Sequence, residues 1–146
     1  MPVVDASVVV HVLLGDEFSE QVRGLLDKAV DESRALLIPP HMLIESVSEV
    51  YQRLRGKRDP RFLISERDAE DALRVLFELP LIVSTQDGLY QLAFAMARDY
   101  DIASIYDALY VAVAQLNNDE LWTADRRLYE AARQILPRVI FVGGQS

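Results

Sequence analysis

Four carboxylates in this chain could together bind metal ions, namely Asp5, Glu45, Asp107 and Asp125. The chain has no cysteine, and we expect no histidine close to these acids. A cluster of carboxylate oxygens of this kind suits Mg²⁺ or Mn²⁺ rather than zinc. Two such ions can activate a water and stabilise the leaving oxygen when a phosphodiester bond is hydrolysed. The residue types therefore indicate metal-dependent phosphodiester chemistry.

Each of the four acids also has an ordinary structural interpretation. Asp5 and Asp125 precede predicted helices and can cap them, a position that aspartate fills well. Asp107 follows Ser104 by three residues, which is the spacing of a capping box. Glu45 falls roughly opposite the apolar positions of its helix, as a solvated glutamate does. Helical spacing alone therefore does not identify a site.

Five short, mostly apolar runs alternate with segments of helical period. Runs that are apolar throughout are typical of strands buried on both faces of a parallel sheet. Strands that alternate with helices predict right-handed crossovers and helices on both sheet faces. We therefore expect residues 1–146 to form a single doubly wound α/β domain with a mainly parallel sheet of about five strands. The predicted strands are Pro2–Val4, Ala35–Ile38, Leu81–Val83, Glu120–Thr123 and Val139–Val142.

The helical segments place the four acids near strand ends. Asp5 closes the first predicted strand, and Asp125 follows the fourth by two residues. Ligands in open α/β sheets lie beyond the carboxyl ends of the strands, so we expect the acids to converge on that edge. The predicted helices are Phe18–Val30, Leu43–Leu54, one from Ser65 to near Pro80, Leu89–Arg98, Ile105–Leu116 and Arg126–Ile135.

The formal net charge of −8 argues against generic binding to nucleic acid, because polyphosphate is attracted to positive surface. Bound divalent metal would change the local charge around the acids. The basic residues are also concentrated, with five of them in nine positions. They can form a solvated helix end and loop or contact RNA phosphates, and both interpretations stay open. These residues are Arg53, Arg55, Lys57, Arg58 and Arg61, and the loop Gly56–Arg61 is the likeliest flexible segment.

Several other functions are disfavoured by what the sequence lacks. The beginning of the chain has no signal-peptide pattern, and no apolar run is long enough to cross a membrane, so we expect a cytoplasmic protein. The glycine-rich loops that bind nucleotide phosphates are absent, so we expect no nucleotide cofactor. His11 and His41 are isolated and are not predicted to act as general bases. The helical tyrosines are interpreted as packing residues, namely Tyr51, Tyr90, Tyr106, Tyr110 and Tyr129.

Four segments in chain order resemble the PIN-domain toxins of the VapC kind. Val3–Val10 is similar to the family's opening segment, with an aspartate followed by a serine. Pro40–Glu45 resembles its proline followed five residues later by the second acid. Ser104–Ala114 resembles the helix of the third acid and is the most specific match, and Leu121–Leu128 resembles the Thr-x-Asp-x-x-Leu segment of the fourth. The matches run in register through nearly the whole chain.

The resemblance implies a PIN fold and an endoribonuclease that depends on Mg²⁺ or Mn²⁺. It also implies a homodimer and control by a small cognate antitoxin protein, as in a type II toxin–antitoxin pair. By the family's pattern Asp5, Glu45 and Asp107 would bind metal directly, and Asp125 would bind it or support the ligands. Ser7 and Thr123 would hold the carboxylates by hydrogen bonds.

Other readings of an acidic pocket on such a sheet fit less well. A phosphoacceptor receiver domain needs a lysine at the end of its last strand, and the two lysines, Lys28 and Lys57, lie elsewhere. A haloacid-dehalogenase-like phosphatase needs a second aspartate where this chain has Ser7. The remaining alternative is a catalytically inactive PIN-like module that binds RNA or protein. Metal-dependent cleavage of RNA would separate that module from an enzyme.

Overall fold

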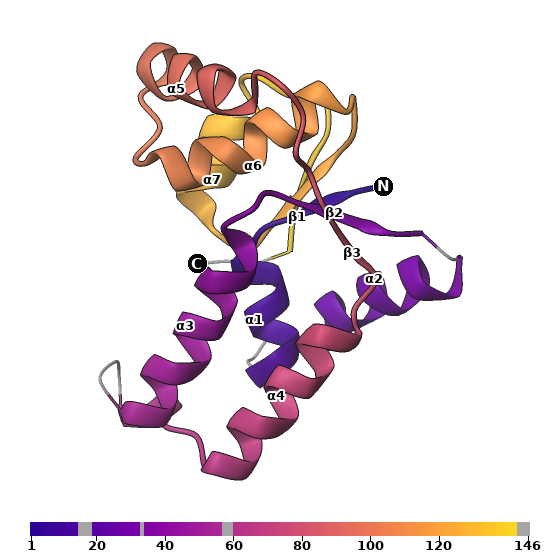
Figure 1. Cartoon of the computed structure of the whole chain (residues 1–146), viewed down its shortest axis with the longest axis vertical. Coiled ribbons are helices and arrows are strands. Elements are labelled where there is room, and N and C mark those ends of the chain that lie inside the picture. The colour runs from indigo at the N-terminus through magenta and orange to yellow at the C-terminus, as the bar shows by residue number, and fades with distance from the viewer. Residues whose placement is uncertain (15–18, 33, 57–59, 143–146) are drawn as a thin grey trace.

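The protein, described here from a computed structural model, is built around a five-stranded parallel sheet (Figure 1). The structure describes residues 1–14, 19–32, 34–56 and 60–142. The strands lie in the order β3-β2-β1-β4-β5, and every neighbouring pair is parallel. The predicted doubly wound α/β fold is therefore confirmed. The strands are β1 (Val3–Val4), β2 (Leu36–Ile38), β3 (Leu81–Val83), β4 (Leu121–Thr123) and β5 (Val139–Phe141).

Helices cover both faces of the sheet. Helices α1 to α4 lie on one side, whereas α5, α6 and α7 lie on the other (Figure 1). This division follows from right-handed crossovers, because the chain moves outward in one direction from β1 to β3 and in the opposite direction from β4 to β5. The helices are α1 (Ala6–Leu14), α2 (Ser19–Asp31), α3 (Met42–Arg55), α4 (Glu66–Glu78), α5 (Leu89–Tyr100), α6 (Ile105–Leu116) and α7 (Arg126–Ala132).

Most element boundaries lie within one or two residues of their predicted positions. Two helices depart from the expectation: α1 follows Asp5, where we expect a helix but predict no range, and α7 ends at Ala132 rather than Ile135. Pro137 disfavours helical backbone at the residue before it, and the chain turns ahead of it toward β5. The predicted loop Gly56–Arg61 contains a 3₁₀ turn at Pro60–Phe62, and its residues 57–59 lie outside the described residues.

The core is centred on the three inner strands and on α6. Every residue of β1, β2 and β4 is buried, whereas the edge strands β3 and β5 are more exposed. In α6 all seven residues from 108 to 114 are buried, so this helix is enclosed on all sides. A helix that is apolar all round is typical of a protein interior. Its first turn, which carries Asp107, is thereby fixed to the sheet.

The centre of the sheet is a topological switch point. Strands β1 and β4 are neighbours, although one begins the chain and the other lies near its end, and their register pairs Val4 with Trp122. The next residues are Asp5 and Thr123, which therefore come side by side at the carboxyl edge. The crevice at such a switch point is where open α/β sheets bind ligands. Among the described residues, no helix has the length and apolar character to cross a membrane.

Candidate active site

Asp5 is a buried carboxylate at the end of β1, with 3% of its surface exposed. Its Oδ1 accepts from the backbone N–H groups of Ser7 (2.8 Å) and Val8 (3.3 Å) and from the Ser7 hydroxyl. Its Oδ2 accepts from the Thr123 hydroxyl, and the Ser7 hydroxyl accepts in turn from Ala124 N–H at 3.0 Å. Both supporting residues from the sequence analysis thus contact Asp5 directly.

These hydrogen bonds do not fully offset the burial of the Asp5 charge. Burial raises the pKa of Asp5 to about 6 from its usual 3.8, although the hydrogen bonds from Ser7, Thr123 and Val8 each lower it. A buried carboxylate favours its neutral form unless an opposite charge is near. Asp5 is therefore held in one orientation, but its negative charge is not balanced by a nearby positive charge from the described residues. A bound cation would supply that charge.

Asp125 is connected to Asp5 through Thr123. The Thr123 hydroxyl donates to Asp5 and accepts from the backbone N–H of Asp125 at 3.0 Å. The Asp125 side chain caps α7, because its Oδ1 accepts from the N–H groups of Arg127 (2.9 Å) and Leu128 (3.3 Å). Asp125 can therefore cap the helix and belong to the acidic cluster at the same time. The capping hydrogen bonds fix its carboxylate in position.

Asp107 lies in the first turn of α6 and faces two of the other acids. Its N–H donates to the Ser104 hydroxyl at 3.1 Å, so that Ser104 caps the helix. Burial raises the pKa of Asp107, and the negative charges of Asp125 and Glu45 raise it further. Glu45 and Asp107 line one hollow of the structure, and Glu45 and Asp125 line a second. The structure therefore brings Asp107, Asp125 and Glu45 to a common region.

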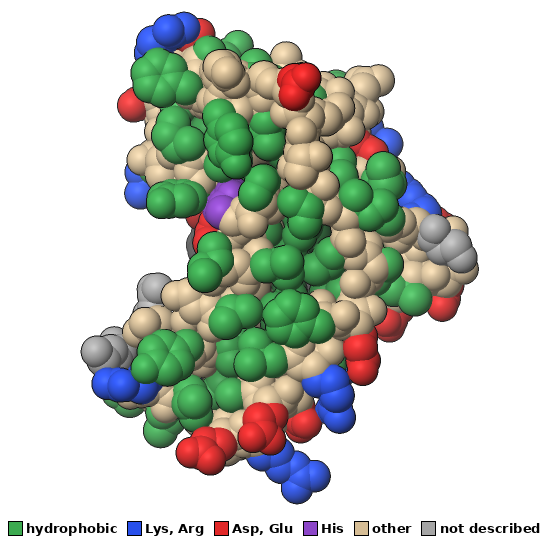
Figure 2. Space-filling model, viewed as in Figure 1, with side chains coloured by type: hydrophobic (Ala, Val, Ile, Leu, Met, Phe, Trp, Pro, Cys, Tyr) green, Lys and Arg blue, Asp and Glu red, His purple; other side chains and the backbone are tan. Residues whose placement is uncertain are grey.

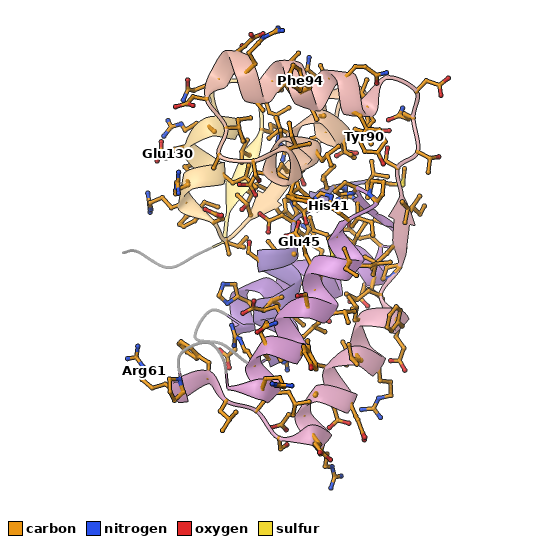
Figure 3. The ribbon with its side chains drawn as sticks, turned by 60° about the vertical axis from the view of Figure 1, so that its left-hand side comes forward. His41, Glu45, Arg61, Tyr90, Phe94 and Glu130 are labelled. Atoms are coloured by element: carbon orange, nitrogen blue, oxygen red, sulfur yellow. The ribbon has the colours of Figure 1, made fainter. Side chains whose placement is uncertain are left out.

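Glu45 belongs to α3 and is more buried than a solvated glutamate, with 38% of its side chain exposed. The Tyr110 hydroxyl donates to its Oε1 over 3.4 Å and accepts from the Ala6 N–H over 3.3 Å. The Nε2 atom of His41 lies 2.7 Å from the same oxygen, although not in hydrogen-bond geometry. Figure 3 shows His41 and Glu45 next to each other where the two helical layers meet.

His41 and Tyr110 were not assigned to this region from the sequence. The expectation that no histidine lies near the acids is wrong, because His41 contacts Glu45 one helical turn away. The His41 ring also lies 5.4 Å from the Tyr106 ring and 4.8 Å from the Tyr110 ring, measured between centroids. The spacings from 41 to 45 and from 107 to 110 place each pair on one helix face, and that signal was available.

The tyrosines do not all serve as packing residues. Tyr110 is buried as expected, with 1% exposed. In contrast Tyr51, Tyr90 and Tyr106 are between 51% and 62% exposed. Tyr110 differs from these three because it is buried, and a buried phenol needs hydrogen-bond partners for its hydroxyl. Burial and the charges of Glu45 and Asp5 raise the pKa of Tyr110, so its hydroxyl stays protonated.

Two adjoining hollows open onto the acids. One has a volume of about 460 Å³ and is lined by Glu45, Asp107 and Tyr106, among others. The second, of about 400 Å³, is lined by Ser7, His11, Glu45, Arg53 and Asp125. Glu45 lines both hollows and therefore stands at their junction. Figure 2 shows the surface indented beside the histidine, between the upper and lower halves of the molecule.

The five basic residues considered for RNA contact are not equivalent. Arg53 lines the second hollow, where its Nε lies 3.3 Å from Oε1 of Glu49 and its guanidinium stacks over Phe62. Arg55 donates to the Tyr51 hydroxyl on the exposed surface. Arg61 lies far from Glu45 at the end of the molecule (Figure 3). Lys57 and Arg58 lie outside the described residues. Among the members of this basic group that the structure describes, Arg53 alone lines either of the two hollows at the acids.

The donor set around the hollows fits a hard divalent ion. Within the described ranges, no three acidic or histidine side chains are gathered tightly enough to hold one ion as they stand. The donors that face one another are nevertheless carboxylates, and two of them, Asp5 and Asp107, carry raised pKa values because of burial. Oxygen donors of this kind are the ligands that Mg²⁺ and Mn²⁺ prefer.

Comparisons with known proteins agree with this geometry. The family model for the PIN domain matches residues 3–134, which include all four acids. The chain is 34% identical over 130 residues to Ribonuclease VapC3 from Pyrobaculum aerophilum, covering 88% of this chain and 92% of that protein.

Two solved structures share the fold. One is VapC20 from Mycobacterium tuberculosis, a sarcin–ricin loop cleaving toxin (TM-score 0.61, 19% identity, 90% of this chain and 95% of that one). The other is VapBC2 from Rickettsia felis, bound to a DNA fragment from their promoter (TM-score 0.64, 12% identity, 96% of each chain). With the family model and the relative each spanning most of its length, this chain belongs to the PIN-domain family.

Proposed function

We propose that this protein is a metal-dependent endoribonuclease, the toxin of a type II toxin–antitoxin pair that acts in the cytoplasm. The proposal is supported by the hydrogen bonds that join Asp5, Thr123 and Asp125 at the switch point of the sheet, and by the two hollows that place Glu45 beside Asp107 and Asp125. The name of the relative Ribonuclease VapC3 supports RNA as the substrate. The acidic cluster supports hydrolysis of a phosphodiester bond.

In this proposal Asp5, Glu45 and Asp107 hold Mg²⁺ or Mn²⁺, and Asp125 binds the ion or supports its ligands. When bound, the ion supplies an activated water and counter-charge for the phosphodiester. Ser7 and Thr123 keep the Asp5 carboxylate in one orientation through their hydroxyl groups. The α7 cap does the same for Asp125.

Arg53 is the basic residue best placed to contact an RNA phosphate. It lines the same hollow as Ser7, Glu45 and Asp125. Glu49 and Phe62 contact its guanidinium. A planar guanidinium can pair with two phosphate oxygens at once. We assign no phosphate contact to Arg61, which lies away from the hollow.

The proposed partners are a small antitoxin protein and a second copy of this chain. An acidic hollow on a protein of net charge −8 is complementary to an arginine or lysine of an antitoxin. The exposed apolar side chains near the hollows support a homodimer, because large patches of this kind mark interfaces. They are Ile44 and Tyr106, which line the first hollow, and Ile105, which precedes Tyr106.

Cleavage of a fluorescent single-stranded RNA tests the proposal. The wild-type protein should cleave with Mg²⁺ or Mn²⁺ and not with EDTA. Asp107→Asn should lower the rate roughly a hundredfold or more, because it removes a metal ligand. The matched control is Asp99→Asn, which changes an exposed aspartate paired with Arg98. Cleavage that persisted in EDTA, or that Asp107→Asn left intact, would favour a contaminant or a non-enzymatic binding module.

A further inference from the structure

The side chain of Tyr110 lies inside the candidate site, although it is not one of the acids. Only 1% of the residue is exposed, and its hydroxyl makes two hydrogen bonds to other parts of the chain. It donates to Oε1 of Glu45 on α3 and accepts from the N–H of Ala6 at the start of α1. Ala6 directly follows Asp5 in the chain. One hydroxyl therefore joins the segments that carry Asp5 and Glu45.

Tyr110 is also fixed relative to the third acid. It follows Asp107 by three residues on α6, so both side chains lie on the same face of that helix. The helix is buried throughout residues 108–114 and cannot shift easily against the sheet. The distance between Tyr110 and Asp107 is thus set by a rigid element.

Glu45 is the acid that most needs such a constraint. Its side chain is 38% exposed and has several rotatable bonds, so it loses conformational freedom when it is held in one position. Asp5 and Asp125, in contrast, accept hydrogen bonds from the backbone beside them. The His41 ring, one turn before Glu45, lies 4.8 Å from the Tyr110 ring and keeps that ring in place.

We propose that Tyr110 is a positioning residue whose hydroxyl fixes the Glu45 carboxylate relative to Asp5 and Asp107, so that the acids are arranged before a divalent ion binds. This inference rests on the proposed function. Partners that orient metal ligands change metal affinity or activity by about 10- to 100-fold when they are removed. The ordinary alternative is that Tyr110 only fills space in the core.

Tyr110→Phe separates these alternatives, because phenylalanine keeps the ring and removes only the hydroxyl. The matched control is Tyr100→Phe, which removes a hydroxyl from an exposed tyrosine at the end of α5. Making the same change in a Glu45→Gln variant shows whether the loss of the hydroxyl acts through its hydrogen bond to Glu45 or through its hydrogen bond to Ala6. If the hydroxyl acts through the carboxylate, the two changes are not additive.

The experiment measures Mn²⁺ binding to the purified full chain by electron paramagnetic resonance, and the unfolding midpoint in EDTA and with Mn²⁺. Tyr110→Phe should bind Mn²⁺ about 10- to 100-fold more weakly than wild type and show a smaller rise of the midpoint. Tyr100→Phe should match wild type. In the Glu45→Gln background, Tyr110→Phe should weaken binding little further. For RNA cleavage, kcat should fall while KM stays unchanged.

Three results would overturn the inference. If Tyr110→Phe binds Mn²⁺ as tightly as wild type, Tyr110 has no such role and the proposed function is unaffected. A variant that does not fold would show that the hydroxyl serves the fold itself. A wild-type protein that binds no Mn²⁺ would overturn the proposed function and this inference together.

Discussion

The hydroxyl of Thr123 donates to the carboxylate of Asp5 across the boundary between β4 and β1. The two residues are 118 positions apart, and the parallel register of the two strands makes them neighbours. The same hydroxyl accepts from Asp125 N–H, so it organises two of the four acids. Thr123, which the sequence shows only as the last residue of a strand, thus links Asp5 to Asp125 in the candidate site.

Thr123→Val tests that connection, since valine keeps the shape and removes the hydroxyl. The buried Asp5 carboxylate and the Asp125 N–H would each lose a partner. We expect the free energy of unfolding to fall by about 1–3 kcal/mol, measured by urea denaturation. Thr85→Val, at an exposed position, should change it by less than about 0.5 kcal/mol. Equal losses for the two variants would show that the hydrogen bond to Asp5 has no special weight.

The raised pKa of Asp5 predicts how stability depends on pH when metal is absent. The folded state binds the proton more tightly than the unfolded chain, so the unfolding free energy decreases as pH rises from about 4 to 6. The whole cost is at most about 3 kcal/mol, from the difference between the usual pKa of 3.8 and the raised pKa of about 6.

Asp5→Asn should remove this dependence. In EDTA at pH 7.5 we expect the variant to unfold at a higher temperature than wild type, and the difference should shrink as the pH approaches 4. Thermal unfolding at four pH values measures it. A gap between the two proteins that stayed constant with pH would contradict the assignment of the titration to Asp5.

Asp107→Asn should be more stable than wild type without metal and should be stabilised less by added metal. Burial, together with the repulsion from Asp125 and Glu45, raises the pKa of Asp107, so removing its charge should raise the unfolding midpoint in EDTA. Added Mn²⁺ should stabilise wild type by roughly 2.7 kcal/mol at about 100 times its Kd, and the variant by less. Equal midpoints for both proteins with and without Mn²⁺ would count against a shared site.

Arg53 and Arg55 make a matched pair for substrate binding. Arg53→Gln should raise KM for RNA roughly tenfold, because a charged hydrogen bond to phosphate is lost. Arg55→Gln should leave KM nearly unchanged, since Arg55 pairs with Tyr51 on the exposed surface. Steady-state cleavage of one RNA by both variants decides the point, and a larger effect from Arg55 would move the phosphate contact elsewhere.

The fold could be predicted because it depends on local pattern, whereas the four acids were proposed from the resemblance to PIN-domain toxins and not from spacing. Apolar runs such as Leu36–Ile38 mark buried strands, and strand ends bring Asp5 and Thr123 to one edge. The surroundings of Glu45 could not be predicted in the same way. Its neighbour Tyr110 lies 65 residues further along the chain, and their contact depends on how α3 and α6 pack over the sheet. Spacing within one helix says nothing about such a contact.

The helices α1, α3, α6 and α7 all begin beside one of the four acids. Peptide dipoles add along a helix and leave roughly half a positive charge at its amino end. Four such ends directed at one cluster offset part of the repulsion among the carboxylates. This counter-charge belongs to the main chain, so no side-chain substitution can remove it. The backbone thus offsets part of the negative charge that basic side chains would otherwise have to neutralise.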